Sequence, residues 1–324
     1  MDIETAVLQA TGSTAILRQE TLQSLWSGYG AIKRYVLSGG AHRSVIVKHV
    51  QIPEQPSHPR GWNTARSHAR KVSSFEVETH WYRHLSQACN HHCRVAQCLA
   101  THQRDGEFLM ILEDLDAAGF AKRLTTATLA QMRPCIDWLA RFHATFLGKT
   151  ANGLWPIGTY WHLDTRPDEL DALEDRALKH AAAKIDRALR DCPFQTLVHG
   201  DAKLANFCFA DDYQAVAAVD FQYVGGGCGM KDLAYFIGSC LDEDECAAHE
   251  QTLLDGYFNA LKRALDEQGK SGLASEIEAA WRPLFAYAWT DFHRFLKGWS
   301  PDHWKINRYS ERLSQHVLAE LAQQ

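Results

Sequence analysis

Four polar residues in the middle of the chain have the types and spacing needed to move a phosphoryl group. Asp201 and Asn206 lie five residues apart, and Asp220 follows fourteen residues later. Amide and carboxylate oxygens are hard ligands that suit Mg²⁺, so Asn206 and Asp220 are candidate metal ligands. The carboxylate of Asp201 can accept the proton of a hydroxyl that attacks phosphorus. Lys203 can offset negative charge on the transferred group.

A short hairpin is expected to bring two of these side chains together. Residues 207–209 and 215–219 are β-type runs, and the residues between them supply a turn. Folding this hairpin makes Asn206 and Asp220 neighbours, while Asp201 lies in the loop that leads to the same place. The alternative is that Asp201 only caps a turn and Asp220 only ends a strand. We favour the chemical interpretation because three polar groups converge.

The elements that must position this site fall into two classes along the chain. In the first third, residues 35–37 and 44–48 are β-type runs separated by a Ser-Gly-Gly turn, which predicts a hairpin. A helix is predicted from about residue 74 to 88, and residues 107–112 predict another strand. The charged residues 113–116 that follow are taken as a connector.

Beyond the connector the chain is predicted to be mainly helical. Apolar residues at helical spacing between 129 and 146 mark one face of an amphipathic helix. Further helices are predicted at residues 168–190, 232–241, 246–268, 274–290 and 308–322. The expected fold class is therefore α+β, with a small antiparallel β lobe at residues 1–115 and a larger, mainly helical lobe at residues 116–324.

Composition limits the classes of partner. Apolar residues make up 46% of the 324 residues, the net charge is −5 and the pI is about 6.4, so no nucleic-acid partner is expected. No secretory signal and no run of about 18 apolar residues is evident, so we expect a cytoplasmic protein with no membrane partner. Nine scattered cysteines fit reduced thiols. A metal site at residues 89–93 is the alternative, and the oligomeric state is left open.

The motifs resemble a known superfamily. His-Gly-Asp with an asparagine five residues on, then a distal aspartate after a hairpin, resembles aminoglycoside phosphotransferases, choline kinases and their relatives with the bilobal protein-kinase-like fold. Residues 220–222 and 232–236 are most similar to the ecdysteroid kinase-like and choline kinase-like branch. The resemblance implies a kinase that uses ATP and Mg²⁺, with Asp201 as catalytic base. It also implies that Asp232 anchors the catalytic loop.

The same resemblance assigns nucleotide-binding residues to the first lobe. Lys48, in the middle of an apolar strand, would bind the ATP phosphates; the alternative is an exposed residue on a half-solvated strand face. Glu78 on the following helix would pair with Lys48, and Glu76 is the competing candidate. Glu113 and Leu115 in the connector would offer backbone groups to adenine.

A phosphate-covering loop is predicted at residues 25–33, with Gly28 and Gly30 as its glycines. These are only two of the three in the pattern Gly-x-Gly-x-x-Gly, so a plain turn is the alternative. The P-loop pattern Gly-x-x-x-x-Gly-Lys-Ser/Thr does not occur in the sequence, which excludes a P-loop NTPase.

The acceptor is expected to be a small-molecule alcohol. Protein kinases place a peptide-docking segment ending in Ala-Pro-Glu after the distal aspartate, and no such triplet follows here. Residues 158–163 and the aromatic residues 289–299 with Trp304 are candidate acceptor segments, where Asp291 and aromatic faces could hold a quaternary ammonium. The alternative is that these aromatics are core. A choline-like amino alcohol is the first expectation, followed by an aminoglycoside or a steroid-like alcohol.

Two other functions are considered. The incomplete glycine loop would suit a nucleotide-binding pseudokinase that acts as a scaffold without turnover. A hydrolase with Asp201 as nucleophile is the third possibility, but the sequence has neither a Gly-x-Ser-x-Gly elbow nor a metal-binding histidine pair.

Overall fold

The structure is a computed structural model that describes residues 2–25, 28–52 and 65–323. The chain divides into two compact units. Unit 1 contains Met1–Lys122 and Cys208–Gln222, and unit 2 contains Arg123–Phe207 and Tyr223–Gln324. Unit 1 therefore combines the N-terminal third of the chain with a later segment.

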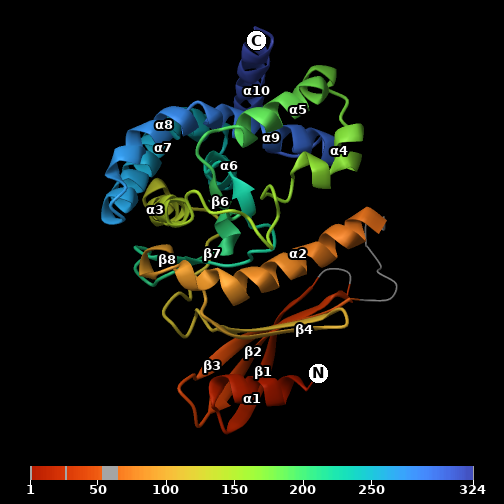
Figure 1. Cartoon of the computed structure of the whole chain (residues 1–324), viewed down its shortest axis with the longest axis vertical. Helices are drawn as coiled ribbons and strands as arrows, with labels where there is room; N and C mark the ends of the chain where they lie inside the picture. Colours follow the sequence, from red (N-terminus) through yellow and green to blue (C-terminus); the bar gives the residue numbers. More distant parts are fainter. Residues whose placement is uncertain (1, 26–27, 53–64, 324) are drawn as a thin grey trace. The chain divides into compact units, whose positions relative to one another are not determined.

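A five-stranded antiparallel sheet forms most of unit 1 (Figure 1). In spatial order its strands are β1 (Ala15–Ser24), β2 (Gly30–Ser38), β3 (Ser44–Gln51), β5 (Glu107–Glu113) and β4 (Cys98–Arg104). The predicted hairpin and the predicted strand at 107–112 are confirmed. β1 was not predicted because it is an edge strand with eight exposed residues in a row, and it lacks the apolar alternation of a half-buried strand.

Two helices cover opposite faces of this sheet. α1 (Ile3–Thr11) contributes Val7 to a cluster with Val45 and Val47, while Phe75 of α2 (Ala65–His84) packs with Val50. Odd and even positions of a strand face opposite ways, so α1 and α2 lie on different faces. The helix predicted from residue 74 to 88 is wrong at both ends. It already includes Ala65, and after His84 a separate 3₁₀ turn, η2, spans Ser86–Ala88.

The predicted hairpin after Asn206 is confirmed. β7 (Phe207–Phe209) pairs with β8 (Val216–Ala218), and the Ala210 amide donates to the Ala215 carbonyl at 2.9 Å. A 3₁₀ turn, η3 (His91–Cys93), precedes the bridge that Val95 makes with Ala218. The hairpin segment is thereby attached to the rest of unit 1.

Unit 2 is mainly helical (Figure 1). Its helices are α3 (Leu129–Thr145), α4 (Pro167–Asp171), α5 (Arg176–Arg190), α6 (Met230–Cys240), α7 (Glu243–Glu267), α8 (Ala274–Trp281), α9 (Leu284–Trp299) and α10 (Arg308–Leu321). Strands β6 (Thr196–Val198) and β9 (Gly225–Gly227) pair antiparallel, and the 3₁₀ turns are η4 (Leu163–Thr165), η5 (Leu204–Asn206) and η6 (Ser271–Leu273).

Two of the predicted helices are each divided into two. The region 168–190 contains α4 and α5, and α5 begins after Asp175, whose side chain accepts from the Leu178 amide at 3.0 Å. The region 274–290 contains α8 and the start of α9, with Pro283 between them. Proline has no N–H to continue the helical hydrogen bonding, so a new helix begins there.

Together the antiparallel sheet and the mainly helical unit confirm the α+β fold class. Within the described ranges, none of the helices has the length and apolar character required to cross a bilayer.

Candidate active site

Lys48 lies in the middle of β3 and is buried, with only 5% of its surface exposed. Its ammonium contacts the Glu78 carboxylate at 2.5 Å, and Glu78 on α2 is itself 2% exposed. Glu76 is exposed on the same helix. The predicted Lys48–Glu78 pair is therefore confirmed, and the alternatives of an exposed Lys48 and of Glu76 as its partner are wrong. Phosphate binding by Lys48 stays a prediction.

Asp220 joins this pair within unit 1. Its Oδ1 lies 3.9 Å from the Lys48 ammonium. Its backbone is in the left-handed region, with φ of +68°, which aspartate tolerates better than most residues. The next residue, Phe221, stacks on Trp81 of α2 with ring centroids 4.7 Å apart. This stacking holds the backbone that presents Asp220 toward Lys48.

The charges of this group determine its chemistry. Burial acts to lower the pKa of Lys48, but the negative charges of Glu78 and Asp220 outweigh it and the pKa is raised. Burial raises the pKa of Glu78, against the opposing effect of Lys48. Because the Lys48 ammonium lies next to two carboxylates, its positive charge is the one that the group stabilises. A buried ammonium whose pKa is raised is suited to bind phosphate oxygens as a point charge.

Replacing Glu78 tests this arrangement. We expect Glu78→Gln to lower the free energy of unfolding by about 1–3 kcal/mol, because the buried Lys48 ammonium loses the negative charge of its partner and keeps only a neutral amide oxygen. The thermal shift produced by ATP should shrink in the same variant. The matched control is Glu76→Gln, the same change at an exposed position two residues away. Equal behaviour of the two variants in urea unfolding and in the ATP shift would refute a special role for Glu78.

The connector predicted to contact adenine is fixed by its own polar contacts. Glu113 accepts from the Arg94 guanidinium at 2.5 and 2.6 Å, and the Leu115 carbonyl accepts from the Phe120 amide at 2.8 Å. Asp114 accepts from Arg34 at 2.7 Å; burial opposes the effect, but this bond and others lower the pKa of Asp114. The side chains of the connector thus have structural partners, and adenine binding by Glu113 and Leu115 remains a prediction for the backbone.

The predicted glycine loop has a short described part. Gly28 and Gly30 have φ of +76° and +134°, and residues 26 and 27 lie outside the described residues. A Cβ at Gly30 would lie 2.0 Å from the His49 carbonyl oxygen, so only glycine fits where β2 pairs with β3. Residues 30–33, predicted as loop, belong to β2. Phosphate covering by Gly28 and Gly30 stays a prediction.

In unit 2, the loop that carries Asp201 is held by Asp232. The Asp232 carboxylate, fully buried at the start of α6, accepts from the backbone amides of His199 at 2.5 Å and Gly200 at 2.9 Å. His143 of α3 lies 3.1 Å from the same carboxylate, and its other ring nitrogen lies 2.7 Å from the Tyr257 hydroxyl. The predicted anchoring role of Asp232 is confirmed. The contributions of His143 and Tyr257 were not predicted.

Asp201 itself is 7% exposed and is oriented by its neighbours. Its Oδ2 accepts from the Lys203 ammonium at 3.0 Å and from the Asn206 amide nitrogen at 3.1 Å. The same Asn206 nitrogen donates to the Asp201 carbonyl at 2.7 Å. These bonds fix the carboxylate on its loop, as a general base requires.

A strained backbone segment lies against this loop. Thr159 has φ of +106°, which is a genuine outlier for a β-branched residue, and its hydroxyl is buried without a hydrogen-bond partner in the described structure. Tyr160 donates its amide to the Gly200 carbonyl at 3.2 Å. A Cβ at Gly200 would lie 2.8 Å from the Thr159 nitrogen. Strain of this kind clusters at functional sites, and nothing in the sequence marks it.

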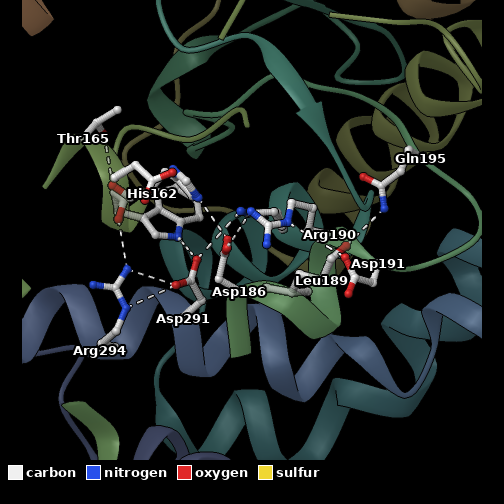
Figure 2. A network of polar contacts seen from close by, with 12 residues as sticks. His162, Thr165, Asp186, Leu189, Arg190, Asp191, Gln195, Asp291 and Arg294 are labelled. Carbon is white, nitrogen blue, oxygen red and sulfur yellow. Dashed lines mark hydrogen bonds and ion pairs between the residues drawn. The ribbon is translucent and has the colours of Figure 1, made fainter. Parts of the chain in front are cut away.

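The aromatic residues of α9 and of the segment 158–163 are mostly core. Trp161 and Phe295 are fully buried, and Asp291 is 1% exposed. Asp291 accepts from the Trp161 indole at 3.0 Å and from the Arg294 guanidinium at 3.0 Å. Figure 2 shows Arg294 pointing toward Asp291. Its charge is therefore balanced inside the protein. The expectation that Asp291 could hold a substrate cation is wrong, because the carboxylate already has an internal cation.

The metal assignment can be tested against the donors. Within the described residues, no cluster of three or more His, Cys, Asp or Glu side chains could hold a metal, residues 89–93 included. A magnesium ion held by substrate phosphates needs only one or two protein oxygens. The amide nitrogen of Asn206 donates a hydrogen bond to Asp201, so its amide oxygen points away from Asp201. The Asp220 side chain is 37% exposed. Both residues fit such an ion.

The predicted residues thus form two sets. Lys48, Glu78 and Asp220 lie together in unit 1, and Asp201, Lys203 and Asn206 lie together in unit 2. The predicted meeting of Asn206 and Asp220 concerns residues of different units and stays a prediction.

A family model matches residues 42–148 and 158–270, which is more than half of the chain. The chain belongs to the ecdysteroid kinase-like family, and so to the kinase-like small-molecule phosphotransferases. This confirms the resemblance inferred from the motifs. No curated protein sequence matches the chain significantly.

Several solved structures are similar to the chain at low identity. A microcompartment-associated aminopropanol kinase is 14% identical, covers 98% of this chain and 97% of its own, and has a TM-score of 0.48. An aminoglycoside phosphotransferase from Streptomyces rimosus, solved with ADP and streptomycin, is 14% identical, with coverages of 88% and 99% and a TM-score of 0.46. A choline/ethanolamine kinase family protein from Mesorhizobium loti is 14% identical, with coverages of 94% and 94% and a TM-score of 0.43. The family assignment rests on the sequence match.

Proposed function

We propose that this protein is a kinase that transfers the γ-phosphoryl group of ATP to a hydroxyl of a small molecule. The observation that carries the proposal is the buried Lys48 ammonium, paired with Glu78 at 2.5 Å and 3.9 Å from Asp220. Kinases bind the phosphates of ATP with a lysine that is held in place by a carboxylate. The buried Lys48, next to Glu78 and Asp220, matches this arrangement. Membership of a kinase-like family supports the same conclusion.

Asp201 acts as the base in this proposal. The acceptor oxygen forms a bond to the γ-phosphorus, the bond from that phosphorus to the ADP oxygen breaks, and the acceptor proton passes to the Asp201 carboxylate. Lys203, which contacts Asp201 at 3.0 Å, offsets charge on the transferred group. Asn206 keeps the Asp201 carboxylate oriented through its amide nitrogen.

Asn206 and Asp220 would hold Mg²⁺ through their oxygens. The ion supplies neutralisation of the phosphate charges when it is bound. The acceptor groups expected from the sequence are a choline-like amino alcohol, an aminoglycoside and a steroid-like alcohol. All three share the hydroxyl that the proposal requires.

The test is ATP consumption by the full chain with a panel of alcohols, with and without EDTA. We expect ADP release that depends on acceptor and on Mg²⁺, and a product that mass spectrometry shows to carry one added phosphoryl group. An ATP-induced thermal shift without any ADP release would contradict the proposal and point instead to a nucleotide-binding scaffold.

A further inference from the structure

A lysine of unit 2 lies on the faces of three aromatic rings. The ammonium of Lys305, in the turn between α9 and α10, is 5.2 Å from the ring centre of Tyr235, 5.6 Å from that of Phe292 and 5.4 Å from that of Trp304. Trp304 is 61% exposed, so this group of rings reaches the surface. Rings in this arrangement attract a cation, and the protein supplies that cation itself.

A second cation of the protein lies over the neighbouring aromatic rings. The Arg166 guanidinium lies 5.9 Å from the ring centre of Tyr160 and 5.3 Å from that of Phe295. Tyr160 and Tyr235 share a hydrogen bond of 3.3 Å between their hydroxyls, so the two groups of rings are continuous. The ring faces that could have bound an ammonium group of a substrate therefore already carry positive charge.

Lys305 differs from nearby cations in its counter-charge. Arg166 contacts Glu169 at 3.0 Å, Lys297 contacts Asp175 at 2.9 Å, and Lys231 lies 3.8 Å from Asp291. Lys305 forms no ion pair within the described part of the chain. Burial lowers the pKa of Lys305 to about 8, which is the sign of an ammonium that lacks full compensation.

The charge of Lys305 acts close to Asp201. The titratable groups close enough to shift the pKa of Lys305 are the thiols of Cys240 and Cys246, the carboxylate of Asp201 and the ammonium of Lys203. Asp201 in turn raises the pKa of Tyr160 and of Tyr235, after burial, which is the larger cause. Lys305 and its rings are therefore neighbours of the carboxylate that accepts the acceptor's proton.

We propose that Lys305 is the residue that selects the acceptor by charge, and that it binds an acidic group carried by the acceptor alcohol. This inference rests on the proposed function and deepens it. An acidic group on the acceptor gives Lys305 the ion-pair partner that it lacks among the described residues. An ammonium group on the acceptor meets Lys305 and Arg166 and is repelled. Amino alcohols, the first acceptor expected from the sequence, are accordingly poor acceptors, and this inference replaces that expectation.

The experiment compares three alcohols of the same length: propanolamine, propanediol and hydroxypropanoate. For the unaltered protein we expect kcat/KM to be at least about tenfold higher with hydroxypropanoate than with propanolamine. Lys305→Gln should remove this preference through KM, with propanediol unchanged. Lys305→Arg should retain it, and Lys305→Glu should reverse it. Lys149→Gln, the loss of an exposed lysine in the same unit, is the matched control.

The outcomes separate this inference from the proposed function. A preference of the unaltered protein for propanolamine, or an equal loss with all three alcohols in Lys305→Gln, overturns the role of Lys305 while leaving a kinase. If no alcohol is phosphorylated, the proposed function fails. The role of Lys305 is then tested by whether the acidic alcohol binds to it. Hydroxypropanoate should then slow acetylation of Lys305 by an amine-reactive ester, as followed by mass spectrometry, whereas propanolamine should not. Equal protection by both overturns the inference.

Discussion

Asp201→Asn should lower kcat by about 10²–10⁴-fold while leaving the binding of ATP and Mg²⁺ intact, because a positioned general base contributes about that much. The amide keeps the shape of the carboxylate and one acceptor oxygen for Lys203 and Asn206, which contact Oδ2 at 3.0 and 3.1 Å. It cannot accept the proton of the acceptor hydroxyl. The nucleotide is assigned to Lys48 and Asp220 in unit 1, which this substitution does not change.

Steady-state kinetics and the ATP-induced thermal shift measure the two effects separately. The matched control is Asp211→Asn, the same chemical change at an exposed turn position of the β7–β8 hairpin, which should leave kcat unchanged. A kcat near that of the unaltered protein in Asp201→Asn would remove Asp201 as the base. A lost ATP shift in the same variant would mean that the residue acts on nucleotide binding instead.

Asp232→Ala should lower the free energy of unfolding by about 3–5 kcal/mol, the cost of removing one partner from a fully buried charged network. The two backbone amides of His199 and Gly200 would lose their acceptor, and His143 would lose its partner. Each buried donor left without an acceptor costs about 1–3 kcal/mol. Since total stabilities are only about 5–15 kcal/mol, the variant should be close to unfolding.

Urea unfolding and amide hydrogen exchange test this prediction. Exchange at His199 and Gly200 should accelerate in Asp232→Ala. Tyr257→Phe is the control, since it removes the hydroxyl that is hydrogen-bonded to the far side of His143 and should cost about 1 kcal/mol with these two amides still protected. A stability of Asp232→Ala within about 1 kcal/mol of the unaltered protein would show that other contacts hold the loop.

Several parts of the site follow from local sequence. The β7–β8 hairpin forms because β-type runs flank a turn, and the pairing of Lys48 with Glu78 follows from a charged residue in an apolar strand and a helix after it. The choice of Glu78 over Glu76 was correct because helical periodicity places Glu78 on the buried face. Periodicity also gave most helices of unit 2, with errors where caps or proline break them.

Other parts depend on contacts between distant residues. His143 and Asp232 are 89 residues apart, and the sequence around His143 is an ordinary amphipathic helix. The strained φ of Thr159 occurs where its backbone packs closely against Gly200, a contact that no local propensity predicts. Asp291 was expected to face a substrate, but Trp161 and Arg294 enclose it. The direction in which a charged side chain points is set by packing, so the sequence could not decide it.

The sequence by itself determined that Asp201, Lys203 and Asn206 lie together, because they are close in the chain and a single loop must present them. It also determined the helical and β-rich parts, because the period of apolar residues depends only on backbone geometry. Three facts were decided only by the tertiary structure. The Asp232 carboxylate accepts from the Gly200 amide, Asp291 pairs with Arg294 inside the protein, and the Lys305 ammonium lies over the ring of Tyr235. In each case the question is which groups a charged side chain contacts. These contacts depend on how the whole unit packs, so the local sequence does not determine them.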